Sequence, residues 1–219
     1  TLLPGGKVLV AGGSTYQSSQ VLSQAQLYDP VANTWTSTGS LSSARSGHSA
    51  TLLPNGKVAV IGGRGATGTL SSVEIYDPGA GTWSTSTASL ATARKFHTAT
   101  LVADGRVVIV GGSSSADAPL ASVEIFASNS PAWSATGAMG AARAYTQPVM
   151  LPDGRILVSG GFNGTDLATA DLYNPATGTW SSAGTMVSGH TEGTATLLPN
   201  GKVLLAGHRQ LADANKSEL

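Results

Sequence analysis

The stretch TLLPNGKVAVIGG, residues 51–63, is one of five closely similar segments of this chain. The others read TLLPGGKVLVAGG (1–13), TLVADGRVVIVGG (100–112), VMLPDGRILVSGG (149–161) and TLLPNGKVLLAGH (196–208). Successive copies are 50, 49, 49 and 46 residues apart, measured at the glycine pair or at its equivalent Ala206-Gly207. A period near 50 residues indicates a repeat architecture, in which each repeat is one supersecondary unit.

Each repeat predicts four antiparallel strands. Within residues 51–63, two aliphatic runs flank Asn55-Gly56, a pair suited to the two positive φ angles of a type I′ hairpin turn. The same turn is expected at Asp104-Gly105, Asp153-Gly154 and Asn200-Gly201. The next segment, SSVEIYDPGAGTW (71–83), alternates apolar and polar residues, turns at a proline and opens another strand at Trp83.

A four-stranded sheet of this kind has two apolar faces, so neighbouring copies must stack to bury them. Because β-sheets are twisted, sheets stacked at a fixed angle curve around an axis. The sequence therefore predicts an all-β fold, a β-propeller made of four-stranded antiparallel blades.

The domain prediction is a single propeller over residues 1–219 that is incomplete at both ends. We expect blades at approximately 1–41, 44–90, 93–139, 142–187 and 189–219. Gly207 to Glu218 repeats the interval of 11 residues from Gly63 to Glu74, so residues 216–219 should open a third strand. The five visible repeats are expected to be part of a ring of about six or seven blades.

The order of these landmarks resembles the kelch repeat. An arginine, a histidine three residues later, a strand ending in two glycines, and then Tyr-Asp-Pro and Trp follow one another in ARSGHSATLLPNGKVAVIGG (44–63) and EIYDPGAGTW (74–83). The resemblance covers almost the whole chain. It departs from the pattern at FASNSPAW (126–133), at Thr146 in a histidine position and at His190 in an arginine position.

Composition bounds the classes of partner. The chain has 12 basic and 12 acidic residues, and only 11% of its residues are charged, so we expect no nucleic-acid partner. No apolar run is long enough to span a bilayer. The absence of cysteine excludes a disulfide and a thiolate metal site in this chain. We expect no cofactor.

A ligand site is expected where the repeated arginines meet residues that break the repeat. Arginine offers paired donors to a carboxylate, and an aromatic ring offers a stacking face, so an acidic peptide or a carboxylated glycan is the expected ligand. The alternative interpretation is that the arginines bond backbone carbonyls between blades. The predicted ligand-binding residues are Arg45, Arg94, Arg143, His190, Phe96 and Tyr145.

Other repeated residues are expected to be structural. The glycine pairs should fit a crowded turn, and the recurring Trp and Tyr residues should lie between blades. We expect His48 and His97 to bond the neighbouring blade, and no metal site. Carboxylates recur at one blade position, which predicts a solvated outer face for Glu74, Glu124 and Asp171. Asn163 and Asn215 each begin an Asn-X-Ser/Thr glycosylation pattern, which the sequence leaves open.

The predicted function is a non-catalytic kelch-propeller binding module that recognises a protein or a glycan through a channel mouth or its loops. One alternative is a carbohydrate-active enzyme of mutarotase-like type. Kelch propellers also include galactose-oxidase-like copper enzymes, whose Cys-containing cofactor this chain lacks. A second alternative is a structural segment of a surface protein. The Ser/Thr/Gly/Ala-rich style resembles bacterial secreted or cell-surface kelch proteins, and open blade edges predict self-association.

Overall fold

The chain folds into five antiparallel sheets, and no helix occurs among the residues that the structure describes. The structure is a computed structural model, and it describes residues 1–15, 20–127, 132–207 and 217–218. No helix that could cross a membrane is found in this part of the chain. The prediction of an all-β fold is confirmed.

Strands follow one another in chain order within each sheet. The first sheet contains β1 (Val8–Ala11), β2 (Ala25–Asp29) and β3 (Thr34–Thr38). The second contains β4 (Ser49–Leu52), β5 (Val58–Ile61), β6 (Val73–Asp77) and β7 (Thr82–Thr85). The third contains β8 (Thr98–Leu101), β9 (Arg106–Val110), β10 (Val123–Ala127) and β11 (Ala132–Thr136).

The fourth sheet contains β12 (Gln147–Met150), β13 (Ile156–Ser159), β14 (Thr169–Asn174) and β15 (Thr179–Thr185). The fifth contains β16 (Thr194–Leu197), β17 (Val203–Ala206) and β18 (Ser217–Glu218). In β18, Glu218 pairs with Leu205, the register in which Glu74 pairs with Val60. The predicted third strand at the end of the chain is therefore present. Thr194 pairs with Ala206 as Ser49 pairs with Ile61, so Gly207 corresponds to Gly62 and not to Gly63, and the equivalence expected from the sequence is wrong by one residue.

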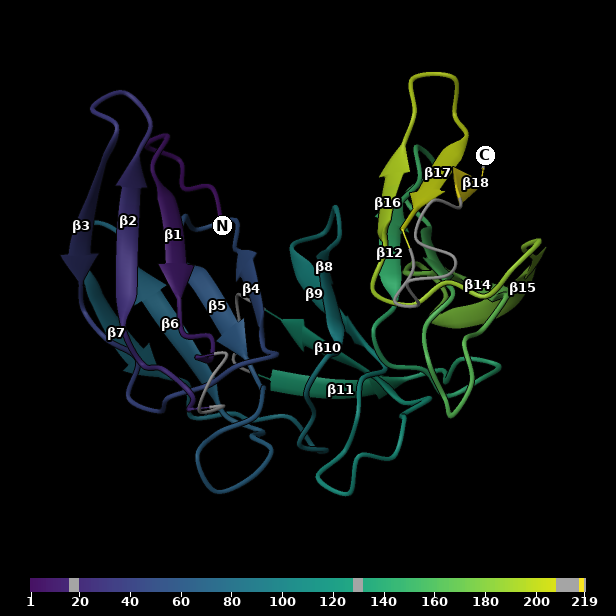
Figure 1. Cartoon of the computed structure of the whole chain (residues 1–219), viewed down its shortest axis with the longest axis horizontal. Helices are drawn as coiled ribbons and strands as arrows, with labels where there is room; N and C mark the ends of the chain where they lie inside the picture. Colours follow the sequence, from purple (N-terminus) through teal and green to yellow (C-terminus); the bar gives the residue numbers. More distant parts are fainter. Residues whose placement is uncertain (16–19, 128–131, 208–216, 219) are drawn as a thin grey trace.

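The sheets stand as blades around an open arc (Figure 1). The first strands β4, β8, β12 and β16 contact one another in succession and form the inner side of the arc. The fourth strands β7, β11 and β15 lie on the outer side. This arrangement is the blade order of a β-propeller.

Apolar residues fill the spaces between successive blades. The second strand of a blade is buried on both faces, which is why β5 reads as the unbroken run VAVI. Val58 and Val60 face the core shared with the first blade, whereas Ala59 and Ile61 face the core shared with the third. Each strand pair therefore contributes to two cores, and no blade has a core of its own.

In the second and fourth blades, tyrosine and tryptophan tie the outer strand pair to the preceding blade. Tyr76 and Trp83 pack with ring centroids 4.9 Å apart. The Tyr76 hydroxyl lies 2.7 Å from Thr38 Oγ1, and Trp83 Nε1 donates to Gly39 O at 2.6 Å. Tyr173 and Trp180 repeat these bonds on Thr136 and Gly137. The interblade prediction is wrong for Trp35, which is 56% exposed because no described blade precedes the first sheet.

The hairpin turns differ from the predicted type. Gly56 has a φ of 79°, but Asn55 has a negative φ, so only one residue of the turn is left-handed. Leu53 O accepts a bond from Gly56 N at 2.9 Å, and Leu53 N donates to Lys57 O at 2.8 Å. This is a type I turn followed by a glycine bulge rather than a type I′ turn. The Asn55 side chain accepts a bond from Lys57 N at 3.1 Å, which explains why Asn or Asp precedes the glycine.

The connections alternate between the two ends of the blades. The end that we call the turn face carries the hairpin turns and the tight turns between third and fourth strands. The end that we call the loop face carries the loops between second and third strands and the links between blades. The described loop residues are 12–15 and 20–24, 62–72, 111–122 and 160–168, and the links are 39–48, 86–97, 137–146 and 186–193.

The glycine pairs and the turn glycines should respond differently to alanine. A Cβ on Gly154 would meet nothing within 4 Å, so Gly154→Ala suffers only from its φ of 83°. A Cβ on Gly62 would also lie 2.6 Å from Arg94 O, a backbone atom that cannot move freely. We expect Gly154→Ala to lower the free energy of unfolding by about 1 kcal/mol and Gly62→Ala by about 3 kcal/mol or more. Urea denaturation followed by tryptophan fluorescence measures both; equal losses would contradict the close approach of the blades.

Candidate functional site

The arginines of the loop face are completely buried. Arg45, Arg94 and Arg143 each have 0% relative exposure. Arg94 Nη1 donates to Gly111 O at 2.8 Å, and Arg94 Nη2 donates to Glu124 Oε1 at 2.6 Å. Burial lowers the pKa of Arg94, and the charge and hydrogen bond of Glu124 partly offset that effect. A ligand would have to displace these protein groups before it could reach the guanidinium.

The carboxylates at the repeated blade position are the partners of these arginines. Glu74 is 1% exposed and accepts a bond from Arg45 Nη2 at 2.7 Å. The same carboxylate accepts bonds from the backbone N–H groups of Ser42 and Ser43 in the preceding link. Glu124 and Asp171 pair with Arg94 and Arg143 in the same way. The prediction of a solvated outer face for these acids is wrong, because a buried cation and unpaired N–H groups require an acceptor there.

Each arginine joins two blades. Its main chain belongs to the preceding blade, since Arg45 N donates to Leu22 O at 3.0 Å and Arg45 O accepts from Gly13 N at 2.8 Å. Its side chain belongs to the following blade, through Gly62 O and Glu74. We call this arrangement the clasp. The glycine pair allows it, because any side chain on the first glycine would collide with the arginine carbonyl.

His190 occupies the clasp position of the fifth blade. Its main chain makes the expected bonds, with His190 O accepting from Gly161 N at 2.7 Å. Its Nδ1 lies 3.1 Å from Gly207 O, the carbonyl that corresponds to Gly62 O. His190 is also buried. The histidine therefore takes over the arginine's bond to the glycine carbonyl.

The histidines at the start of the inner strands contact the preceding blade, as expected. His97 Nε2 lies 2.9 Å from Ser49 Oγ, and the ring of His48 lies against Gly12. Burial, followed by the charges of Arg94 and His48, lowers the pKa of His97 to about 3. Burial, followed by the charge of Arg45, lowers the pKa of His48 to about 4. Within the described residues, no three side chains of His, Cys, Asp or Glu form a group that could hold a metal ion.

Phe96 and Tyr145 are brought together on the loop face. Their rings are stacked, with centroids 4.6 Å apart and an interplanar angle of 26°. Both side chains are half-buried. Of the six predicted ligand-binding residues, these two reach the surface, whereas the three arginines and His190 are held in clasps.

The two aromatic residues belong to a ring of backbone hydrogen bonds that sequence reasoning missed. Gly47, Phe96, Tyr145 and Glu192 each follow a clasp residue by two positions, and their φ angles are 61°, 55°, 58° and 62°. Phe96 N donates to Gly47 O at 2.8 Å, Tyr145 N to Phe96 O at 3.1 Å, and Glu192 N to Tyr145 O at 3.5 Å. We call these four residues the inner ring. A left-handed conformation is costly for a bulky side chain, so this is a site of local strain.

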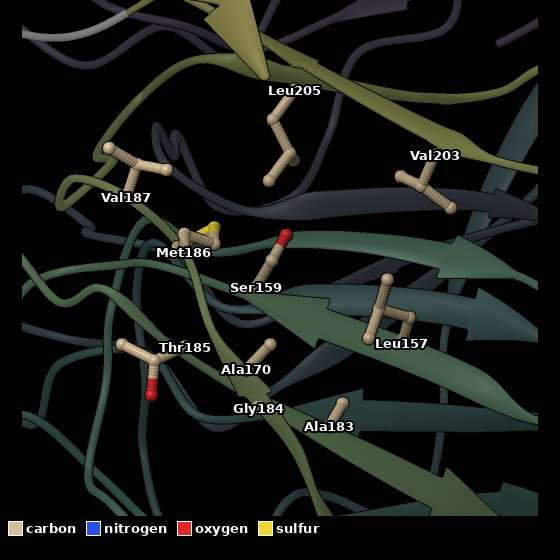
Figure 2. Close-up of a pocket in the computed structure, with 10 residues that line it drawn as sticks. All are labelled: Leu157, Ser159, Ala170, Ala183, Gly184, Thr185, Met186, Val187, Val203 and Leu205. Carbon is tan, nitrogen blue, oxygen red and sulfur yellow. The ribbon is translucent and has the colours of Figure 1, made fainter. Parts of the chain in front are cut away.

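The remaining sequence candidates fall elsewhere. Asn163 is exposed in a loop of the loop face, and Asn215 lies outside the described residues. A cavity of about 340 Å³ lies between the fourth and fifth blades. Figure 2 shows its lining, which comes from β13, β14, the end of β15 and β17 and is mostly aliphatic. It contains none of the six predicted residues, and Met186 in its wall corresponds to Leu41, Leu90 and Met139 of the interblade cores.

Comparisons with known proteins agree with this geometry. The family model described as the KLHDC2/KLHL20/DRC7 Kelch-repeats domain matches residues 1–207. The F-box/kelch-repeat protein At1g67480 of Arabidopsis thaliana is 37% identical over 82 residues, which is 36% of this chain and 22% of that protein. Kelch-like protein 7 of Rattus norvegicus is 35% identical over 66 residues, which is 30% of this chain and 11% of that protein. The matches thus span about a fifth or less of these curated relatives.

A solved structure, described as the structure of YjhT, has the same fold. It superposes with a TM-score of 0.82 at 16% sequence identity, and the match covers 99% of this chain and 78% of that one. At this identity the likeness concerns the arrangement of the blades.

The buried ion pairs should matter far more than the exposed ones. Glu124→Gln keeps the shape of the side chain but leaves Arg94 buried without a counter-charge, so we expect a loss of about 3 to 5 kcal/mol in the free energy of unfolding. Asp153→Asn removes a carboxylate from an exposed pair with Arg155 and should change stability little. Urea denaturation of both variants checks this. A small effect of Glu124→Gln would mean that the clasp does not depend on its carboxylate.

The buried histidines should make the fold sensitive to acid. In the unfolded chain His48 and His97 bind a proton near pH 6.5, whereas burial lowers their pKa values in the folded protein, so their contribution to stability is complete above about pH 7 and falls as the pH decreases. In the variant His97→Thr, which copies Thr146 of the next blade, we expect the loss between pH 7 and pH 5 to be about 2 kcal/mol smaller than in the wild type. Urea midpoints at the two pH values measure it; an equal loss in both proteins would contradict the neutral buried state of His97.

Proposed function

Because this chain belongs to the kelch-repeat family, we propose that it is a non-catalytic interaction module that binds another protein with its loop face. Kelch repeats typically build protein-interaction domains, and binding groups on rigid scaffolds are carried by loops.

One observation carries this proposal: the two faces of the arc differ in how far their sequences repeat. Three of the five hairpin turns on the turn face read Leu-Pro-Asn/Asp-Gly, and the other two, Leu-Pro-Gly-Gly and Val-Ala-Asp-Gly, keep the final glycine. The side chains of Asn55 and Asp153 bond the backbone of their own turns. The loop face differs from blade to blade, with 13, 11, 12 and 10 residues from the second glycine to the next repeated position at Gln26, Glu74, Glu124 and Asp171. The inner ring varies too, since one backbone conformation holds Gly, Phe, Tyr and Glu in successive blades. Specific recognition requires nonuniform groups, and these lie on the loop face.

A glycan is a second candidate partner. The observation in its favour is the stacked pair Phe96 and Tyr145, since an aromatic face is a surface against which the apolar side of a sugar ring packs. The Ser/Thr/Gly/Ala-rich composition suggested that the protein lies at the cell surface or outside the cell, and either location suits a protein or a glycan partner.

Self-association is a further proposal, and it concerns the first blade. Leu2, Val10 and Trp35 are exposed on this blade, whereas Trp83 and Trp180 are tied to a preceding blade. A second copy could cover this apolar face, because exposed sheet faces and edges recruit other chains. This contact would lie away from the loop face.

The test compares loop-face and turn-face variants. Proteins captured by the tagged chain from an extract of its host would be purified, and their affinities would be measured by isothermal titration calorimetry. We expect the loop-face changes Arg64→Ser and Asp117→Ser together to weaken binding about tenfold or more. The matched turn-face pair Lys57→Ser and Asp153→Ser should leave it unchanged. Equal weakening by both pairs, or weakening by the turn-face pair alone, would contradict the assignment of the face. A glycan array with the same two double variants tests the second candidate.

A further inference from the structure

The sequence predicted a positively charged ligand site, but the charged residue of the inner ring is an acid. Three arginines pointed to an acidic ligand, but their guanidinium groups are enclosed in clasps. Glu192 is the charged member of the inner ring, and it is exposed. It follows Tyr145 in the ring, since Glu192 N donates to Tyr145 O.

The acidic end of the ring has a second carboxylate nearby. Asp166 in the loop after β13 accepts a bond from Thr191 Oγ1 at 2.7 Å, and Thr191 is the neighbour of Glu192 in the chain. At the other end, the exposed Arg64 pairs through its backbone with Ser46, the neighbour of Gly47. The inner ring thus has an acidic end, where Glu192 follows Tyr145, and a basic end, where Arg64 lies beside Gly47.

The aromatic pair already binds one cation of the chain itself. Lys95 Nζ lies 5.8 Å from the centroid of the Phe96 ring, a distance at which a cation is attracted to the ring face. The same ammonium group is bonded to Asp117 at 2.6 Å, so its charge is compensated. At Phe96, therefore, the loop face already holds a cation over an aromatic ring and beside a carboxylate.

The left-handed backbone of the inner ring is strained at Phe96 and Tyr145, and folding does not require these side chains there. Gly47 has the same φ as Phe96 and Tyr145 at no steric cost, so the fold accepts glycine at this position. Gly47 also makes room for its neighbour, because a Cβ there would lie 2.6 Å from Phe96 Cε1. Non-glycine residues in a left-handed conformation each cost on the order of 1 kcal/mol, and such residues concentrate at functional sites.

We propose that the Tyr145–Glu192 end of the inner ring binds a basic side chain of the partner, an arginine or a lysine. The cation would lie against the Tyr145 ring and pair with the Glu192 carboxylate, with Asp166 adding to the negative potential. Arginine suits the site better than lysine, because its planar guanidinium both stacks on an aromatic ring and bonds a carboxylate with two donors. This inference rests on the proposed protein-binding function and specifies its ligand chemistry.

The experiment uses three capped tripeptides, acetyl-Gly-Arg-Gly-amide, its citrulline analogue and acetyl-Gly-Glu-Gly-amide. Each is titrated into the full chain while the aromatic ¹H–¹³C resonances of Phe96 and Tyr145 are followed by NMR. We expect the arginine peptide to shift both rings in a saturable way. The citrulline peptide, which has the same shape without the charge, and the glutamate peptide should shift them far less.

Three variants locate the binding. Glu192→Gln should weaken the arginine peptide about fivefold, the effect of losing one exposed ion pair in a stacked geometry. Asp153→Asn removes one exposed carboxylate from the turn face and should leave the affinity unchanged. Tyr145→Gly should abolish the Phe96 shift while the chain stays folded, because Gly47 shows that glycine fits this backbone; the near-ultraviolet circular dichroism of the tryptophans reports the fold.

The outcomes separate this inference from the proposed function. A glutamate peptide that shifts the rings as strongly as the arginine peptide, or an unchanged affinity in Glu192→Gln, would overturn the basic-ligand inference and leave the loop-face proposal standing. Absence of any peptide effect on either ring would also overturn it. The comparison of loop-face with turn-face variants then decides the proposed function independently.

Discussion

The arc depends on the hydrogen bond between the carbonyl of each clasp residue and the second glycine of the preceding blade. Gly63 N donates to Arg94 O, and Gly13, Gly112 and Gly161 make the same bond. The contact brings two backbones so close that the first glycine of each pair can carry no side chain. Where the backbones meet, the arginine side chain is enclosed and needs a carboxylate as its partner. The inner-ring residue, two positions later, is held beside the axis of the arc by the same contact. The glycine pairs, the acids and the ring conformation follow from this one approach.

The repeat allowed most of the fold to be predicted, because blade geometry imposes the same requirement every 49 residues or so. Strand positions, including that of β18, and the interblade role of Tyr76 and Trp83 follow from periodicity and alternation. The turn type did not follow, since Asn-Gly suits both a type I′ turn and a type I turn with a glycine bulge. The chain uses the second of these, with a single left-handed residue.

The site was predicted less well, because sequence periodicity does not tell whether a repeated charge is buried or exposed. Arg45 and Glu74 recur in step, 29 residues apart, and Arg94 and Glu124 are 30 apart. In a chain with so few charges, that common period was a signal of pairing, and it could have identified the ion pairs. Phe96 and Tyr145 were identified because they break the repeat. Their partners Gly47 and Glu192 were missed, since a shared backbone conformation leaves no common residue type in the sequence.

The clasp also has a consequence for how such a chain changes over evolutionary time. The two terminal nitrogens of the Arg45 side chain bond only the blade that follows, Nε bonds Ser43 O two residues earlier, and the main-chain bonds reach only the blade before. A segment that starts at one clasp residue and stops before the next therefore contains every group that it needs to join identical neighbours on both sides. In-frame duplication or loss of such a segment leaves each junction chemically unchanged. Unequal recombination between the near-identical copies can thus lengthen or shorten the array without inventing a new interface, while the residues of the loop face diverge independently in each copy.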